Sequence, residues 1–82
     1  MSSYKINNAV YTVRTRGLEE DFRVARRPIV QLIPFTSMLT IEYIPGEKIK
    51  ITLLDKSAVY ITVEEDNPRD NINLFELYRA LC

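Results

Sequence analysis

Residues 38 to 64 carry the most regular hydrophobic pattern of the chain. Apolar side chains alternate there with polar or smaller ones over three short runs, which two turns separate. Such period-two alternation is typical of strands that bury one face. All the apolar positions of the pattern have odd numbers: Leu39, Ile41, Tyr43, Ile49, Ile51, Leu53, Val59, Ile61 and Val63. The pattern predicts an antiparallel meander whose odd-numbered face packs in the core.

The turns suggest a register for this meander. Pro45, Gly46 and Glu47 predict a type II turn with a bulge, since glycine supplies the positive φ that such a turn requires. The expected pairs across it are Tyr43–Ile49, Ile41–Ile51, Leu39–Leu53, Glu42–Lys50 and Thr40–Thr52. The second turn, residues 55 to 57, predicts Leu53–Val59, Ile51–Ile61 and Lys48–Glu64. Apolar residues then face apolar ones, and opposite charges face each other.

The first 27 residues are less regular. Residues 1 to 8 predict a loose arm, because their serines and asparagines favour turns. Residues 9 to 15, AVYTVRT, predict a first strand. Residues 18 to 27 leave two interpretations open: a short helix with Leu18, Phe22 and Ala25 on one face, or a strand that returns beside the first one.

Two further segments have clear patterns. Residues 28 to 35, PIVQLIPF, predict a strand that is buried on both faces or crosses between layers, with its prolines at the ends or on an outer edge. Residues 71 to 82 predict a helix that packs on the odd-numbered face of the meander, capped by Asp70 or Asn73. Its apolar stripe is Leu74, Leu77, Tyr78 and Leu81, broadened by Ile72 and Phe75.

Composition narrows the classes of protein. Eighty-two residues predict a single domain, and 46% hydrophobic with 27% charged residues is ordinary for a folded chain. Eleven basic and eleven acidic residues cancel, so no overall field attracts nucleic acid or an anionic membrane. The lone cysteine, Cys82, excludes an internal disulfide, and no stretch is long and apolar enough to span a membrane. We expect a cytoplasmic protein.

The residue types argue against catalysis. The chain has no histidine, one cysteine and only two distant glycines, which leaves no ordinary zinc site or phosphate loop and implies no cofactor and no metal. Carboxylates cluster at Glu64, Glu65, Asp66 and Asp70, but their spacing does not fit a calcium loop. We interpret them as a solvated loop between a strand and a helix.

Two features could form a binding surface. Five arginines, Arg14, Arg16, Arg23, Arg26 and Arg27, lie within fourteen residues, although Glu19, Glu20 and Asp21 stand among them and could pair with them. Arginine is enriched in interface cores and recognises phosphate and carboxylate. Tyr60 lies on the even-numbered face of the meander, which should otherwise be polar. Either residues 28 to 35 cover this face, which we favour, or it meets another chain.

The sequence thus predicts an α+β domain over residues 1 to 82. Its antiparallel sheet of four or five strands is centred on the meander, with a C-terminal helix on one face, and an SH3-like barrel is the alternative. We expect a non-catalytic adaptor or inhibitor that binds a larger protein complex, of the kind that viruses and mobile elements encode. A homodimer through an edge strand is a further expectation. The alternative function is a nucleic-acid-binding module that uses the arginines.

Overall fold

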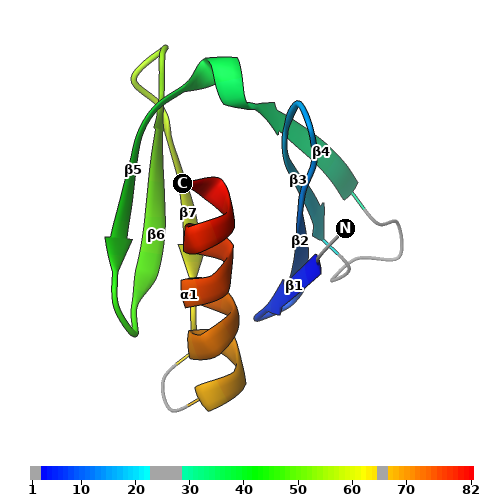
Figure 1. The fold of residues 1–82 in the computed structure, drawn as a ribbon, viewed down its shortest axis with the longest axis vertical. Helices are drawn as coiled ribbons and strands as arrows, with labels where there is room; N and C mark the ends of the chain where they lie inside the picture. The colour runs from blue at the N-terminus through cyan, green and yellow to red at the C-terminus, as the bar shows by residue number, and fades with distance from the viewer. Residues whose placement is uncertain (1–2, 23–28, 65–66) are drawn as a thin grey trace.

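The structure is a computed structural model that describes residues 3–22, 29–64 and 67–82. Within these ranges it has seven strands, one short 3-10 helix and one α-helix (Figure 1). In chain order they are β1 (Ser3–Ile6), β2 (Ala9–Val13), β3 (Gly17–Phe22), β4 (Ile29–Pro34), η1 (Phe35–Ser37), β5 (Met38–Ile44), β6 (Lys48–Leu53), β7 (Ala58–Thr62) and α1 (Pro68–Leu81).

The strands form two antiparallel sheets. The first sheet has the order β1-β2-β3-β4, and the second has the order β5-β6-β7. The helix α1 lies between them, against the second sheet on one side and against β1 and β2 on the other (Figure 1). The α+β class and the packed C-terminal helix are confirmed. The strands form two sheets and not the expected single sheet of four or five strands, because η1 redirects the chain between β4 and β5 and these two strands do not pair. The described strands do not close a barrel.

One core joins all three layers. It comprises Ile6, Ala9, Tyr11 and Leu18 of the first sheet, Ile49, Ile51 and Ile61 of the second, and Leu74 and Leu77 of α1. The odd-numbered face of the meander therefore packs on α1, as predicted. At the edge of this contact the rings of Tyr43 and Tyr78 are stacked, with centroids 4.8 Å apart. Burying large apolar side chains contributes about 1.5 to 3 kcal/mol each, so this shared core holds the sheets together.

The first hairpin of the meander has the predicted register except at its open end. Tyr43 pairs with Ile49, and Glu42 pairs with Lys50. Gly46 has a φ of +74°, and the amide of Glu47 donates to the carbonyl of Ile44, as a type II turn requires. The predicted Leu39–Leu53 pair is wrong. Met38 faces Leu53, and a bulge between Met38 and Thr40 leaves Leu39 exposed.

The second hairpin is shifted by two residues from the predicted register. Ile51 faces Val59, and Lys48 faces Thr62 in place of Glu64. The turn itself causes the shift: the amide of Leu53 donates to the carbonyl of Ser57, and Lys56 adopts a φ of +72°. The side chain of Asp55 accepts the amide of Ser57 and stabilises this turn, whose centre lies one residue earlier than predicted. Because the shift is even, the apolar face is unchanged.

The N-terminal segment is more ordered than the loose arm that we expected. Ser3–Ile6 forms β1 and pairs with β2 through a two-residue turn, in which Asn7 has a φ of 58°. Asparagine tolerates this left-handed conformation, which two-residue hairpin turns need. Residues 17 to 22 form β3, so the helical interpretation is wrong for this part, while residues 23 to 27 lie outside the described ranges.

The helix begins earlier than predicted. Asn67 caps it by accepting the amide of Asp70, and Pro68 occupies the first turn. The predicted caps have other roles. Asp70 is buried and accepts the amide of Asn7 at 3.0 Å, whereas the side chain of Asn73 donates to the carbonyl of Lys5 at 2.8 Å. These two bonds fasten the β1–β2 hairpin to the start of α1.

The strand β4 is an end strand of its sheet, which corrects the expectation that it is buried on both faces. Val30 and Leu32 are 57% and 49% exposed on its outer face. Pro34 ends the strand, as predicted, since proline cannot continue the hydrogen-bonded ladder.

Candidate protein-interaction surfaces

The outer face of the second sheet is open around Tyr60. The Tyr60 side chain is 52% exposed, and Ile44 at the other edge of the same face is exposed as well. Residues 29 to 34 do not cover it; the end of β4 instead meets Leu53 and Leu54 across a hollow of about 320 Å³. The expectation that the chain covers this face is therefore wrong for the described residues. We call the outer-face residues Lys48, Lys50, Tyr60 and Thr62 the Tyr60 face.

The ammonium groups of two lysines of β6 lie close to the ring of Tyr60. The ammonium nitrogen of Lys48 lies 5.3 Å from the ring centroid, and that of Lys50 lies 6.0 Å from it. A cation over an aromatic face is attracted by the ring, by about 0.5 to 1 kcal/mol at exposed sites. Each lysine thereby restricts the ring without covering it. The Tyr60 face is an exposed aromatic group with positive charge beside it.

A shallow hollow of about 190 Å³ continues the Tyr60 face toward the first sheet. Its lining includes Tyr60 and Thr62 of β7, Phe22 of β3, and Asn7 and Asn8 of the β1–β2 turn. The asparagine amides supply donors and acceptors, and the aromatic rings supply apolar area. A side chain inserted beside Tyr60 could therefore be both packed and hydrogen-bonded here.

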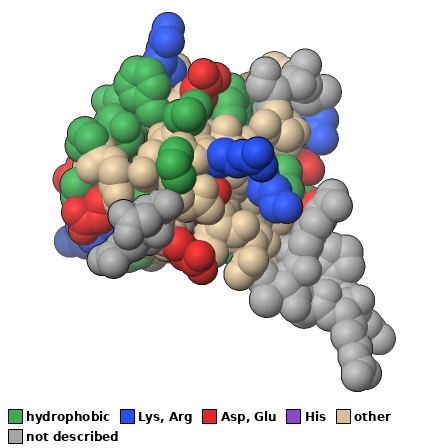
Figure 2. All heavy atoms as spheres, turned by 90° about the horizontal axis from the view of Figure 1, so that it is seen from below, with side chains coloured by type: hydrophobic (Ala, Val, Ile, Leu, Met, Phe, Trp, Pro, Cys, Tyr) green, Lys and Arg blue, Asp and Glu red, His purple; other side chains and the backbone are tan. Residues whose placement is uncertain are grey.

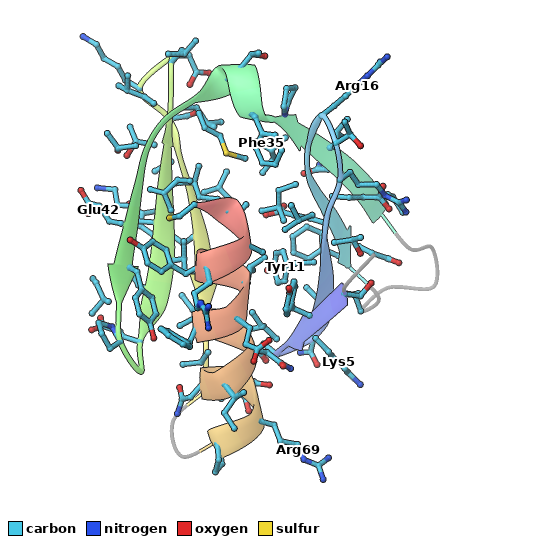
Figure 3. The ribbon with its side chains drawn as sticks, in the orientation of Figure 1. Lys5, Tyr11, Arg16, Phe35, Glu42 and Arg69 are labelled. Atoms are coloured by element: carbon cyan, nitrogen blue, oxygen red, sulfur yellow. The ribbon has the colours of Figure 1, made fainter. Side chains whose placement is uncertain are left out.

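The arginines do not surround Tyr60. Arg14 and Arg16 lie in the turn between β2 and β3, and Arg16 points away from the molecule at its tip (Figure 3). Arg14 pairs with Glu19 at 3.0 Å, so part of the predicted internal pairing is present. The far end of β3, at Phe22, borders the Tyr60 hollow, and a strand of this length spans about 17 Å. Arg23, Arg26 and Arg27 lie outside the described residues.

Charges also mix at the end of the molecule where α1 begins. Basic and acidic side chains are interspersed on this end (Figure 2). Within the described residues, neither this end nor the β2–β3 turn gathers the strongly basic patch that an anionic polymer requires.

A buried acidic group lies inside the first sheet. Glu20 of β3 is only 3% exposed and stands opposite Tyr11 of β2, whose side chain points toward α1 (Figure 3). Burial raises the pKa of Glu20 above its usual range. Burial, with the nearby Glu20 carboxylate, raises the pKa of Tyr11 to about 12. Both groups thus favour their neutral forms, which suits a packed interior.

An apolar hollow of about 480 Å³ opens at the other end of the helix. Val13, Phe35, Met38, Leu39 and Leu81 line it, so it lies where β2, η1, β5 and the end of α1 meet. Its described side chains offer mainly apolar contact, Thr40 is polar, and none of them is titratable.

The acidic residues before α1 show no assembled site. The carboxylate of Asp70 accepts a hydrogen bond from the amide of Asn7, and Glu65 and Asp66 lie outside the described ranges. Among the residues that are described, no three acidic or cysteine side chains come together to hold a metal ion. The described part of the chain also has no helix that is both long and apolar enough to cross a membrane.

The sequence places Lys48 and Lys50 on the same even-numbered face as Tyr60 but does not predict that they lie beside its ring. The predicted register pairs Lys48 with Glu64, and the two-residue shift of β7 brings Lys48 next to Tyr60 instead. The signal was present in the Asp55–Ser57 sequence, whose side-chain turn sets the register.

No family model, curated protein or solved structure matches this chain. Function is therefore inferred from the surfaces of the molecule alone.

Proposed function

We propose that this protein is a non-catalytic adaptor or inhibitor that acts in the cytoplasm and binds a larger protein complex through the Tyr60 face. One observation carries the proposal: a half-exposed tyrosine on an uncovered sheet face, restrained by two lysines. Tyrosine is enriched at interface hot spots, because it buries a large area while its ring loses little conformational freedom. Lysines beside it favour an acidic segment on the partner.

The balance of charge supports a protein partner over a nucleic acid. The chain has equal numbers of basic and acidic residues, and Glu42 faces Lys50 across the second sheet. Glu42 lies beside the Tyr60 face and offsets part of the charge of Lys50, which weakens the attraction to a polyanionic phosphate backbone more than to a polypeptide with few acidic groups. Affinity through this face should therefore depend more on the tyrosine than on total charge.

The test is capture of partners by this chain from an extract of its source, compared with a Tyr60→Ser variant. Loss of a hot-spot tyrosine should lower the amount of bound partner about tenfold or more. Ile72→Ser on α1 is the matched control, since Ile72 is also exposed but lies away from the second sheet's outer face. Equal retention of every partner by Tyr60→Ser and by the wild type would exclude the Tyr60 face.

A second candidate function, binding of single-stranded nucleic acid, uses the same observation. A base can stack on an exposed tyrosine while lysines contact the phosphates. This candidate predicts binding of labelled single strands that weakens steeply with salt and is lost in Tyr60→Ser. Absence of any mobility shift at low salt, for both single and double strands, would remove it.

A further inference from the structure

Two of the four end strands, β1 and β5, carry features that oppose pairing with another chain, and a third, β7, faces the first sheet across a hollow. The outward carbonyl of Lys5 in β1 accepts the side chain of Asn73. Tyr60 and Thr62 of β7 border the hollow against the first sheet. The end strand β5 carries Glu42 and a bulge after Met38. Cover, charge and bulges are the usual devices that block edge pairing.

In the part of the chain that the structure describes, the remaining end strand, β4, shows none of these devices, and Pro34 lies only at its end. Its sequence, IVQLIP, contains no charged residue, and no bulge interrupts its pairing with β3. Gln31 is exposed although it belongs to the inner face, so no described element covers the middle of the strand. The outer face adds exposed Val30 and Leu32.

The hydrogen bonds of the first sheet show which main-chain groups of β4 point outward. The amide of Phe35 donates to the carbonyl of Arg16, and that of Arg14 donates to Gly17. Antiparallel pairs alternate between bonded and non-bonded, so the bonded pairs of β3 and β4 are Leu18–Ile33, Glu20–Gln31 and Phe22–Ile29. Val30 and Leu32 therefore direct their amides and carbonyls to the open edge.

We propose that two copies of this chain pair antiparallel through β4, with Gln31 of each copy on the two-fold axis. Val30 of one copy then faces Leu32 of the other in two equivalent bonded pairs. Every outward amide and carbonyl of Val30 and Leu32 gains a partner, and their four side chains form one apolar cluster on the outer face. The two first sheets become one continuous sheet.

In this register the prolines lie at the ends of the paired segment, where residue 28 of one copy stands opposite Pro34 of the other, and the interior pairs contain none. A shift of two residues in one direction places Val30 opposite Pro34, and a shift in the other direction places Leu32 opposite residue 28, which is also a proline. Proline donates no amide hydrogen, so either shift leaves a carbonyl of the pair without a donor. A shift by one residue would place inner-face side chains opposite outer-face ones.

Dimerisation through β4 leaves the Tyr60 face of each copy accessible, because that face belongs to the second sheet. The dimer is independent of the function proposed for Tyr60, and a failure of one leaves the other standing. If both hold, the protein presents two identical binding faces, and a partner with repeated sites would be bound with increased avidity.

Disulfide trapping tests the register directly. All variants carry Cys82→Ser, since Cys82 is an exposed free thiol. Facing residues have Cα atoms about 4.5 Å apart in a non-bonded pair, as for Gln31 across the axis, and about 5.5 Å apart in a bonded pair, as for Val30 and Leu32. Both are within reach of a disulfide, whereas diagonal neighbours lie about 7 to 8 Å apart, beyond it. We expect Gln31→Cys alone to cross-link under mild oxidation. Val30→Cys and Leu32→Cys should cross-link when mixed, and far less when each is alone.

Sedimentation velocity provides the second measurement. Wild-type protein should approach twice its 9.6 kDa mass as concentration rises to about 1 mM. Leu32→Lys should remain a monomer, while the control Ile72→Lys, with similar exposure on α1, should still dimerise. A wild type that stays monomeric throughout, or cross-linking that does not depend on position, with Ile72→Cys reacting as well as Gln31→Cys, would overturn the proposal.

Discussion

At the scale of single residues, Gly17 is required because a neighbouring strand leaves no room for a side chain, and not because of its backbone conformation. A Cβ atom at Gly17 would overlap the carbonyl oxygen of Ile33 in β4. The oxygen belongs to the backbone of a neighbouring strand, so it cannot move without disturbing the β3–β4 ladder. Gly46 is the opposite case, because its φ is positive but nothing lies within 4 Å of an added Cβ.

Substitution of the two glycines by alanine should therefore lower the stability of the protein by different amounts. Gly17→Ala should lower the free energy of unfolding by about 3 kcal/mol or more, the upper end of the range for overpacking. Gly46→Ala should cost about 1 to 2 kcal/mol, the usual penalty for a left-handed residue with a side chain. Urea denaturation of both variants measures this. A smaller loss in Gly17→Ala than in Gly46→Ala would contradict the close approach of β4 to β3.

Glu20 makes a second residue-scale prediction. Burial raises the pKa of its carboxyl group in the folded protein, whereas in the unfolded chain that group has its ordinary pKa. The folded state thus retains the proton to higher pH. The contribution of Glu20 to stability is full below the unfolded pKa and is lost as pH rises through the folded pKa.

Glu20→Gln should remove this loss, because an amide of the same shape cannot ionise. The variant should equal the wild type near pH 3 and exceed it in unfolding free energy at pH 7, as measured by urea denaturation at both values. Glu19→Gln is the control, since Glu19 contacts Arg14 on the outer face and should give no gain at pH 7. A wild type that is more stable than Glu20→Gln at pH 7 would show that the carboxylate has a partner there.

At the scale of elements, hydrophobic periodicity predicted which face of each meander strand is buried, whereas the residues of the turns determined how the strands pair. The odd-numbered face of the meander was predicted because alternating side chains of a strand lie on opposite faces. The same alternation cannot distinguish registers that differ by two residues, and the second hairpin is shifted by two. Asp55 and Lys56 determine that shift. Strand β1 was missed because its four residues are too few to show a period.

The start of α1 shows that local sequence patterns do not predict contacts between distant parts of the chain. Aspartate is a residue type that often caps helices, and we expected Asp70 to do so from the sequence. In the fold it lies in the first turn of α1, after the cap Asn67, and accepts the amide of Asn7, a residue 63 positions away. No local pattern could indicate this bond.

Asp70→Ala should therefore destabilise the protein by about 1 to 3 kcal/mol, because it leaves the amide of Asn7 without its acceptor in a partly buried place. Asn73→Ala, which removes an exposed bond to Lys5, should cost about 0.5 to 1.5 kcal/mol. Hydrogen exchange should show the β1–β2 hairpin opening first in Asp70→Ala. If the two variants lose equal stability and the hairpin stays protected, Asp70 does not anchor it.

At the scale of the whole molecule, the sequence identified Tyr60 but not its surroundings. The residue stood out because a large aromatic group interrupts an otherwise polar face. Its lysines depend on the register of β7, and its separation from Arg14 and Arg16 depends on the length of β3. Both are outcomes of three-dimensional packing. Proximity in sequence had suggested a single arginine-rich surface, whereas the structure separates Arg14 and Arg16 from Tyr60.

Hydrogen–deuterium exchange of the chain, with and without a partner captured as described above, tests most directly whether the Tyr60 face is the binding surface. The account predicts added protection in β6 and β7, at Lys48–Leu53 and Ala58–Thr62, and in the β1–β2 turn that borders the hollow. Added protection confined to the β2–β3 turn around Arg16 or to α1, with β6 and β7 unchanged, would contradict it.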